Sequence, residues 1–181
     1  MKKTISFALC VVAVMAMLAG CGAPSDRGDA FFTPTNAPTT NAPTTTIPTT
    51  EDPGTTYTFD VGFTVTMKAT LTEQESKLND FFALGNGGEF AIICNLEPIS
   101  DYESFEEYAR LTGEANKTTA QKDANGCYFL DYINTEEGYH FYTAMRQGAE
   151  NYYRVAFYCP LDNWSAYGDD FAQWATTVTV Q

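Results

Sequence analysis

The distribution of apolar and polar positions divides the chain into stretches of different character. Ile5 to Met17 is mostly apolar, residues 33–56 are almost free of apolar side chains, and residues 57–181 show the periods of strands and helices. These patterns predict a sorting signal at 1–20, an anchor-proximal segment at 21–32, an extended tether at 33–56 and a single folded domain at 57–181.

The first part of the domain has the pattern of β-strands. Phe63 to Ala69 alternates between apolar and polar residues, and two further apolar runs cover Leu78–Leu84 and Glu89–Leu96. Asn86-Gly87-Gly88 separates these two runs, and glycines supply the positive φ that a hairpin turn needs. Adjacent apolar pairs such as Ile92-Ile93 predict that both faces of the strands are covered.

Two segments change to a helical period. Ser104 to Glu107 fits a capping box with Ser104 as the N-cap, and the helix that follows is predicted to end near Gly113 and Asn116. A second helix is predicted from Ser165 to Thr176, because its apolar residues recur on one side.

The remaining segments predict an antiparallel meander after the first helix. The expected strands are Thr118–Gln121, Cys127–Ile133, Tyr139–Arg146 and Tyr152–Cys159, with a short closing strand at Val178–Val180. The element order is therefore β-β-β-α-β-β-β-β-α-β. It predicts an α+β domain, with a mainly antiparallel sheet of six to seven strands and a helix packed on each face.

The charge balance limits the classes of partner. The chain has 181 residues, of which 10 are Lys or Arg and 23 are Asp or Glu, so its net charge is −13 and its pI is about 4.2. A nucleic-acid-binding protein needs a basic face, so we expect no nucleic-acid partner. The 44% hydrophobic content is too high for a wholly disordered chain.

The N-terminal segment has the parts of a secretory signal. Met1-Lys2-Lys3 is positively charged, and the apolar run that follows is short for a membrane span. Leu18-Ala19-Gly20-Cys21 resembles the lipobox of bacterial lipoproteins. The resemblance implies that Cys21 is diacylated through its sulfur, becomes the mature N-terminus and anchors the protein, facing outward, to the lipid of the bacterial cell membrane. The alternative is an ordinary secretory signal.

Residues 33–56 form a low-complexity spacer. Eleven Thr and five Pro occur among its twenty-four positions. Such a composition cannot form a core, so an extended, polyproline-like tether is predicted, with a reach of roughly 75 Å at about 3.1 Å per residue. It is either a passive linker or a carrier of O-glycans.

Three segments carry a family resemblance. Val61-Gly62-Phe63-Thr64-Val65, Ser104 to Ala109 and Phe171 to Val178 resemble the opening strand, the first helix and the last helix of the PsbP-like fold. Photosystem oxygen-evolving subunits, some bacterial lipoproteins and a Ran-binding import factor share this fold. The resemblance covers residues 60–180 and implies the fold only, because members bind unrelated partners.

The chain lacks the short motifs of common enzyme classes. No Gly-x-Ser-x-Gly, His-Glu-x-x-His or phosphate loop is present, and His140 is the only histidine. We therefore expect no catalytic residue, no metal site and no cofactor. The alternative, a hydrolase that uses two carboxylates, would need a cleft with two acids of raised pKa.

The cysteines constrain the arrangement of the meander. Cys94, Cys127 and Cys159 are the cysteines of the predicted domain, so at most one internal disulfide can form. Cys127 and Cys159 are predicted at opposite ends of the meander, roughly 20 Å apart, which excludes a bond between them. A bond from Cys94 to either, or three free thiols, stays open.

Aromatic residues on the last two strands supply the candidate binding surface. Five residues expected on one core face are Phe141, Met145, Tyr153, Val155 and Phe157. The side chains left over are His140, Tyr142, Tyr152, Arg154 and Tyr158. They form either a buried layer under the second helix or an exposed strip that binds glycan or peptide.

Together these features predict a lipid-anchored, extracytoplasmic surface protein. Its domain is expected to be non-catalytic and to bind a wall glycan, a peptide or a protein. The alternatives are the carboxylate-dependent envelope hydrolase and a purely structural surface protein.

Overall fold

The structure is a computed structural model that describes residues 54–181. The predicted signal, Cys21 and nearly all of the predicted tether lie outside the described residues. The first strand begins at Thr55, two residues before the predicted start of the domain.

Ten strands and two α-helices make up the described part of the chain. The helices are α1, Phe105–Ala115, and α2, Trp164–Thr177. Short 3-10 turns at Ile99–Asp101 and Leu161–Asn163 precede them. The strands are β1 (Thr55–Phe59), β2 (Phe63–Met67), β3 (Leu71–Glu73), β4 (Phe81–Gly85), β5 (Phe90–Pro98), β6 (Gln121–Lys122), β7 (Tyr128–Asn134), β8 (Tyr139–Gln147), β9 (Asn151–Pro160) and β10 (Thr179–Val180).

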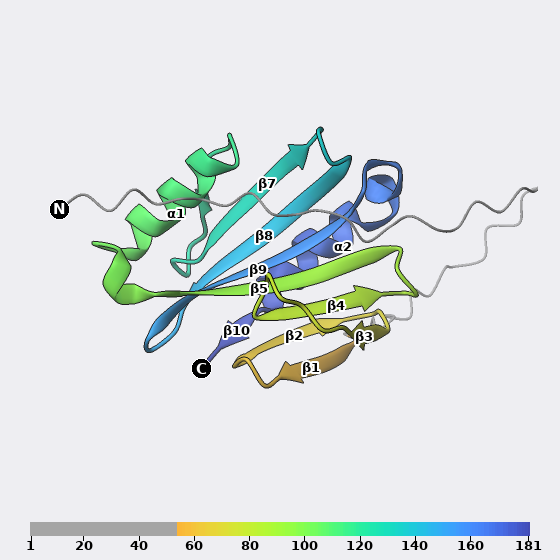
Figure 1. Cartoon of the computed structure of the whole chain (residues 1–181), viewed down its shortest axis with the longest axis horizontal. Helices are drawn as coiled ribbons and strands as arrows, with labels where there is room; N and C mark the ends of the chain where they lie inside the picture. The colour runs from red at the N-terminus through yellow and green to blue at the C-terminus, as the bar shows by residue number, and fades with distance from the viewer. Residues whose placement is uncertain (1–53) are drawn as a thin grey trace, which may run out of the picture. The chain divides into compact units, whose positions relative to one another are not determined.

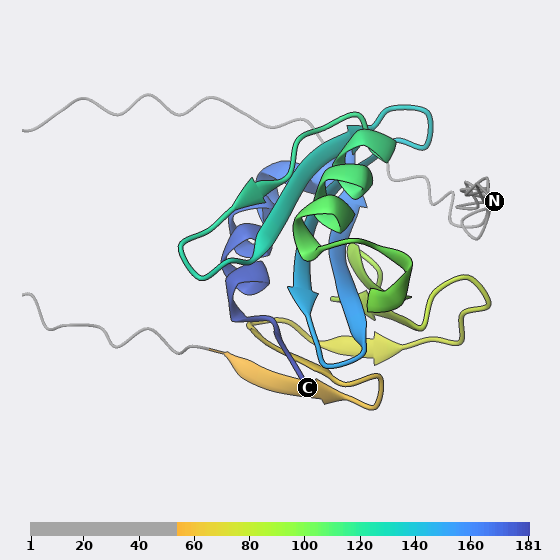
Figure 2. The same cartoon turned by 90° about the vertical axis from the view of Figure 1, so that its left-hand side faces the viewer.

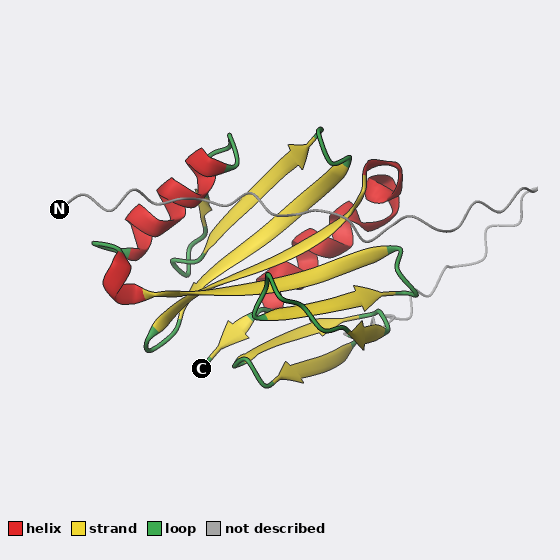
Figure 3. Ribbon diagram, viewed as in Figure 1, coloured by secondary structure: helices red, strands yellow, loops and turns green. Residues whose placement is uncertain are grey.

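The strands form two antiparallel sheets (Figure 1). The larger sheet has seven strands in the order β3-β4-β5-β9-β8-β7-β6, and the smaller has the order β1-β2-β10. Figures 2 and 3 show α1 and α2 on opposite faces of the larger sheet. The predicted α+β class and the helix on each face are confirmed.

Two strands were missing from the predicted order. Five strands precede α1 rather than three, because β1 and β3 were not predicted. The sequence of β1, Thr-Thr-Tyr-Thr-Phe, continues the Thr-rich composition of the tether, and β3 has three residues. β1 becomes a strand through its pairing with β2, from Thr55 opposite Met67 to Phe59 opposite Phe63.

The main core lies between α2, the smaller sheet and one face of the larger sheet. Phe171 and Trp174 of α2 are almost fully buried, and the rings of both lie within 6 Å of the ring of Phe90 on β5. Phe63 and Met67 of β2 are fully buried in the same cluster. Burial of such side chains contributes about 1.5–3 kcal/mol each, so this core holds the two sheets together.

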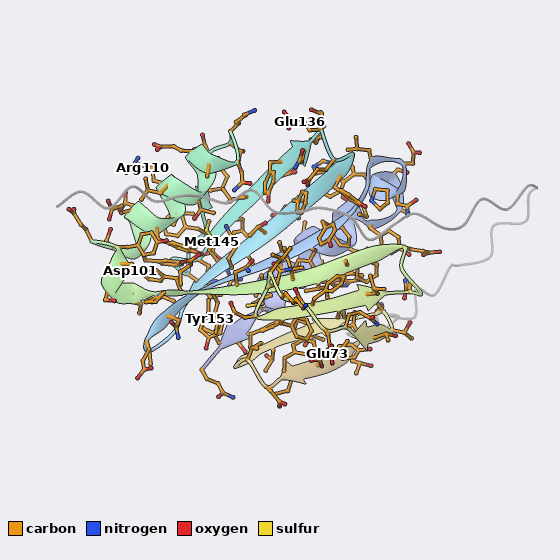
Figure 4. The ribbon with its side chains drawn as sticks, in the orientation of Figure 1. Glu73, Asp101, Arg110, Glu136, Met145 and Tyr153 are labelled. Atoms are coloured by element: carbon orange, nitrogen blue, oxygen red, sulfur yellow. The ribbon has the colours of Figure 1, made fainter. Side chains whose placement is uncertain are left out.

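A smaller core lies under α1. Its central contact is a stack of Tyr108 on Tyr152, with ring centroids 4.8 Å apart, and Met145 of β8 is fully buried beside them (Figure 4). The predicted N-cap is confirmed, since Ser104 Oγ accepts a hydrogen bond of 3.1 Å from the backbone N–H of Glu107. The Glu107 carboxylate accepts from the backbone N–H of Glu103, one residue before the N-cap.

The domain is self-contained. Every strand of both sheets pairs with another strand after residue 54, and both cores consist of residues after that point. A chain that begins at Glu51 therefore contains both sheets, both helices and both cores.

Candidate functional site

The register of β8 and β9 divides the predicted strip between two faces. Odd-numbered residues of β8 lie opposite even-numbered residues of β9, for example Met145 opposite Arg154 and Phe141 opposite Tyr158. Phe141 and Met145 therefore face α1, whereas Tyr153, Val155 and Phe157 face α2. The prediction that these five residues share one core face was wrong. The turn between β8 and β9 pairs odd residues of one strand with even residues of the other, so odd residues of the two strands lie on opposite faces.

The five predicted strip residues consequently do not form one strip. His140 and Tyr142 lie on the α2 side, and Tyr152, Arg154 and Tyr158 lie on the α1 side. Tyr152 is 2% exposed beneath α1 and His140 is 9% exposed, so neither offers a surface to a ligand. Tyr142, Arg154 and Tyr158 are partly exposed.

His140 is packed as a structural residue. Its ring stacks on the indole of Trp164, with centroids 3.3 Å apart, and its Nε2 lies 2.6 Å from the carboxylate of Asp131. Gly168, one turn further along α2, leaves room for the indole, since a Cβ there would lie 2.7 Å from Trp164 Cε2. His140 and Gly168 are both visible in the sequence, but the sequence does not show that both pack against the indole of Trp164.

The α1 side of the larger sheet is covered at one end only. Figures 1 and 3 show α1 over the β7–β8 end, while no helix of residues 54–181 lies over the β4–β5 part of this face. Strand pairing places several partly exposed residues on this side of the sheet. Seven of them make up what we call the open face: Phe82, Leu84, Ile93, Asn95, Tyr139, Arg154 and Tyr158.

Aromatic rings line one end of the open face. Tyr158 stacks on Phe141 with centroids 4.9 Å apart, and Tyr139 meets Tyr158 edge-on at 5.5 Å. Burial raises the pKa of Tyr158 to about 12, and Tyr139 and Glu137 add to the shift. The Tyr158 hydroxyl is therefore a neutral hydrogen-bonding group at physiological pH, and its ring is the part-exposed apolar surface.

Arg154 is the only basic residue of the open face. Its Nη2 donates a hydrogen bond of 3.3 Å to Asn95 Oδ1. The Asn95 amide in turn donates to the backbone carbonyl of Leu78 and to Asn79 Oδ1, at 3.4 and 3.1 Å. Asn95 thus joins the guanidinium to the loop between β3 and β4.

A buried tyrosine lies within the electrostatic reach of Arg154. Burial raises the pKa of Tyr108 above its ordinary value, and positive Arg154 is the largest opposing influence. The Tyr108 hydroxyl is fully buried, and the side chain of Thr112, one turn further along α1, also lowers its pKa.

The described residues contain neither a group of metal ligands nor a cleft with two acids of raised pKa. Between Gly54 and the C-terminus no group of three or more His, Cys, Asp or Glu side chains could hold a metal ion. Burial, followed by neighbouring Glu136, raises the pKa of Glu137, but this pair lies on the β7–β8 turn rather than in a cleft.

The three cysteines of the domain are free thiols. Cys159 lies opposite His140, whereas Cys127 precedes Tyr128, which lies opposite Met145. The register therefore confirms that Cys127 and Cys159 occupy opposite ends of the meander. Burial raises the pKa of Cys94 to about 12, with Asp80 adding to it, and burial raises that of Cys159 to about 11.

Asn95, Phe82 and Ile93 were not predicted as site residues. Both faces of β4 and β5 were expected to be covered, whereas α1 leaves one face of these strands open. A signal was present in the sequence, since Asn95 is the one polar side chain within the apolar run Phe90–Leu96. A polar residue in such a run marks a strand face that is not sealed.

Comparisons with known proteins concern the fold. No protein-family model matches the chain, and a search of curated proteins finds no similar sequence. The structure is similar to cyanobacterial PsbP (CyanoP) from Synechocystis sp. PCC 6803, with a TM-score of 0.51 at 10% sequence identity, over 77% of this chain and 100% of that chain. The domain has a PsbP-like fold. At this identity the likeness transfers no functional residue to the PsbP-like domain.

The two helices of the PsbP-like domain are not membrane spans. Within the part of the chain that the structure describes, no helix is both long and apolar enough to cross a bilayer.

Proposed function

We propose that this protein is a lipid-anchored, extracytoplasmic and non-catalytic binding protein, and that its ligand binds on the open face. The Leu18-Ala19-Gly20-Cys21 sequence supports the anchor, and the Thr/Pro-rich stretch supports a tether that holds the PsbP-like domain away from the membrane.

The observation that carries the binding role is the difference between the two faces of the larger sheet. On the α2 side the inward residues of β5 and β9, such as Ile92, Val155 and Phe157, are fully buried. On the α1 side Ile93 and Tyr158 of the same strands stay partly exposed. Partly exposed apolar residues gathered on one face are typical of a surface that a partner covers.

A photo-crosslinking experiment in cells tests the binding role. A photoreactive phenylalanine analogue replaces Tyr158 in the full chain, and a control carries it at Arg110, which Figure 4 shows on the outer side of α1. Arg110 has 55% of its side chain exposed. The expected result is an adduct from position 158 and none from position 110.

The chemistry of that adduct separates the classes of partner. Loss of the adduct after muramidase digestion indicates a wall glycan, and loss after protease treatment indicates a peptide or protein. No adduct, or equal adducts at both positions, would contradict the binding role and favour a purely structural surface protein.

The anchor has its own test. Cells that express the full chain are fed an alkyne-labelled palmitate, and the Cys21→Ser variant serves as the control. The label should appear in the wild-type chain alone, because the thioether needs the Cys21 sulfur. Absence of the label from the wild-type chain would refute lipidation at Cys21. The crosslinking result at Tyr158 would still test the binding role independently.

A further inference from the structure

The guanidinium of Arg154 has unused hydrogen-bonding capacity. An arginine side chain carries five N–H donors, and among the residues that the structure describes the one hydrogen bond of the Arg154 side chain goes to Asn95 at 3.3 Å. Within residues 54–181 no carboxylate oxygen lies within 4 Å of it, as the two ion pairs of this region belong to Arg110 and His140. A partly exposed arginine without a carboxylate is suited to binding an oxyanion from outside.

An apolar side chain lies beside this polar group. Leu78, in the loop before β4, is 58% exposed, the most of any large apolar residue of the domain. Its backbone carbonyl accepts a hydrogen bond from the same Asn95 amide whose oxygen accepts from Arg154. Asn95 thus links the backbone of Leu78 to the guanidinium, and Ile93, two residues from Asn95 on the same face of β5, lies opposite Phe82.

The charge of the domain restricts the anion that fits. Residues 57–181 contain 7 basic and 19 acidic side chains, a net charge of −12. Glu97 lies on the same sheet face two residues from Asn95, and the Asp80 carboxylate accepts a hydrogen bond from the backbone N–H of Leu96 beside Asn95, so a polyanion or a phosphate dianion would be repelled. A single carboxylate matches the single guanidinium.

We propose that Arg154 binds the free C-terminal carboxylate of a peptide, with the last side chain of that peptide packed against Leu78 and the open face. This proposal rests on the proposed binding function and names its ligand. The aliphatic character of Leu78 and Ile93 favours an apolar terminal residue over an acidic sugar, which would stack on aromatic rings alone.

A pair of matched peptides tests the proposal by NMR on the chain that begins at Glu51. N-acetyl-alanyl-leucine as the free acid is titrated first, and the same dipeptide with a C-terminal amide serves as the control, because it lacks only the charge. The free acid should shift the signals of Leu78, Asn95 and the Arg154 side chain, and the amide should leave them unchanged.

Two arginine variants make the test specific. Arg154→Gln should weaken binding of the free acid by roughly 10-fold or more, since a hydrogen-bonded charge pair is lost. Arg110→Gln removes the same charge from the outer side of α1 and should have no effect. Arg154→Lys keeps the charge without the planar fork and should bind with intermediate affinity, which separates charge from geometry.

Several outcomes would overturn the carboxylate site. These are equal shifts from acid and amide, unchanged affinity in Arg154→Gln with an intact spectrum, and tighter binding of glucuronic acid or inorganic phosphate than of the peptide acid. If the Tyr158 adduct survives in the Arg154→Gln chain, the binding role stands and the carboxylate site alone has failed.

Discussion

Replacing Arg146 with methionine should destabilise the domain because this arginine fastens the end of α2 to the sheet. Arg146 is 6% exposed, and its guanidinium donates to the carbonyls of Ala175 and Val178 at 2.7 and 3.0 Å. It also lies 4.9 Å from the centre of the Phe129 ring. Burial lowers its pKa, and the negative end of the α2 dipole stabilises the charged form.

The size of the effect follows from these contacts. Each hydrogen bond from a charged donor contributes about 1.5–3 kcal/mol, and the two bonds to α2 therefore contribute about 3–6 kcal/mol. Methionine fills a similar volume and ends the desolvation cost of a buried cation, which offsets part of the loss. We expect a net loss of about 2–4 kcal/mol, or roughly 10 °C in the melting temperature for a domain of this size.

The assay is urea unfolding of the chain from Glu51, with Arg110→Met as the matched control. Arg110 pairs with Glu114 on the exposed side of α1, so its replacement should cost less than about 0.5 kcal/mol. Hydrogen exchange should accelerate at Thr179 and Val180, whose strand follows α2 directly. A loss below about 1 kcal/mol for Arg146→Met would refute the role of this arginine.

Three further predictions concern other contacts. Gly168→Ala should destabilise the domain, although alanine favours helices by about 1 kcal/mol, because the methyl group displaces the Trp164 ring; increased stability in urea would contradict this. Ser104→Ala should cost about 1 kcal/mol through the lost N-cap, and Ser104→Gly should cost less; equal losses would exclude capping as the cause. The raised pKa values of Cys94 and Cys159, about 12 and 11 against 9.0 for an unperturbed thiol, predict alkaline destabilisation. The unfolded chain releases these protons first, so stability is full below pH 9 and falls as the pH rises toward 11; unfolding midpoints that stay constant from pH 8 to 10.5 would disprove it.

Local sequence patterns predict much of the architecture. The capping box at Ser104, the glycine turn after β4 and the alternation in β7, β8 and β9 each act over a few residues, so the sequence shows them directly. The two missed strands lack such signals. Their strand state comes from a partner strand, as Thr55 opposite Met67 illustrates.

The candidate site was likewise predicted only in part from the sequence. Arg154 and Tyr158 were predicted from the aromatic pattern, but their grouping with His140 depended on the register of two strands. A one-residue offset moves every side chain of a strand to the other face, and composition does not encode it. The burial of Tyr152 under α1 likewise depends on where a helix lies.

The sequence by itself therefore determined the α+β class, the order of most elements, the acidic character and the lipobox-like Cys21 segment. These properties depend on residue type and short-range period alone. The tertiary structure decided which face of the larger sheet stays open, and it joined Asn95 and Leu78 to Arg154 across some sixty to eighty residues of chain. Contacts of that kind arise only when packing brings distant segments together, because no local signal ties one to another.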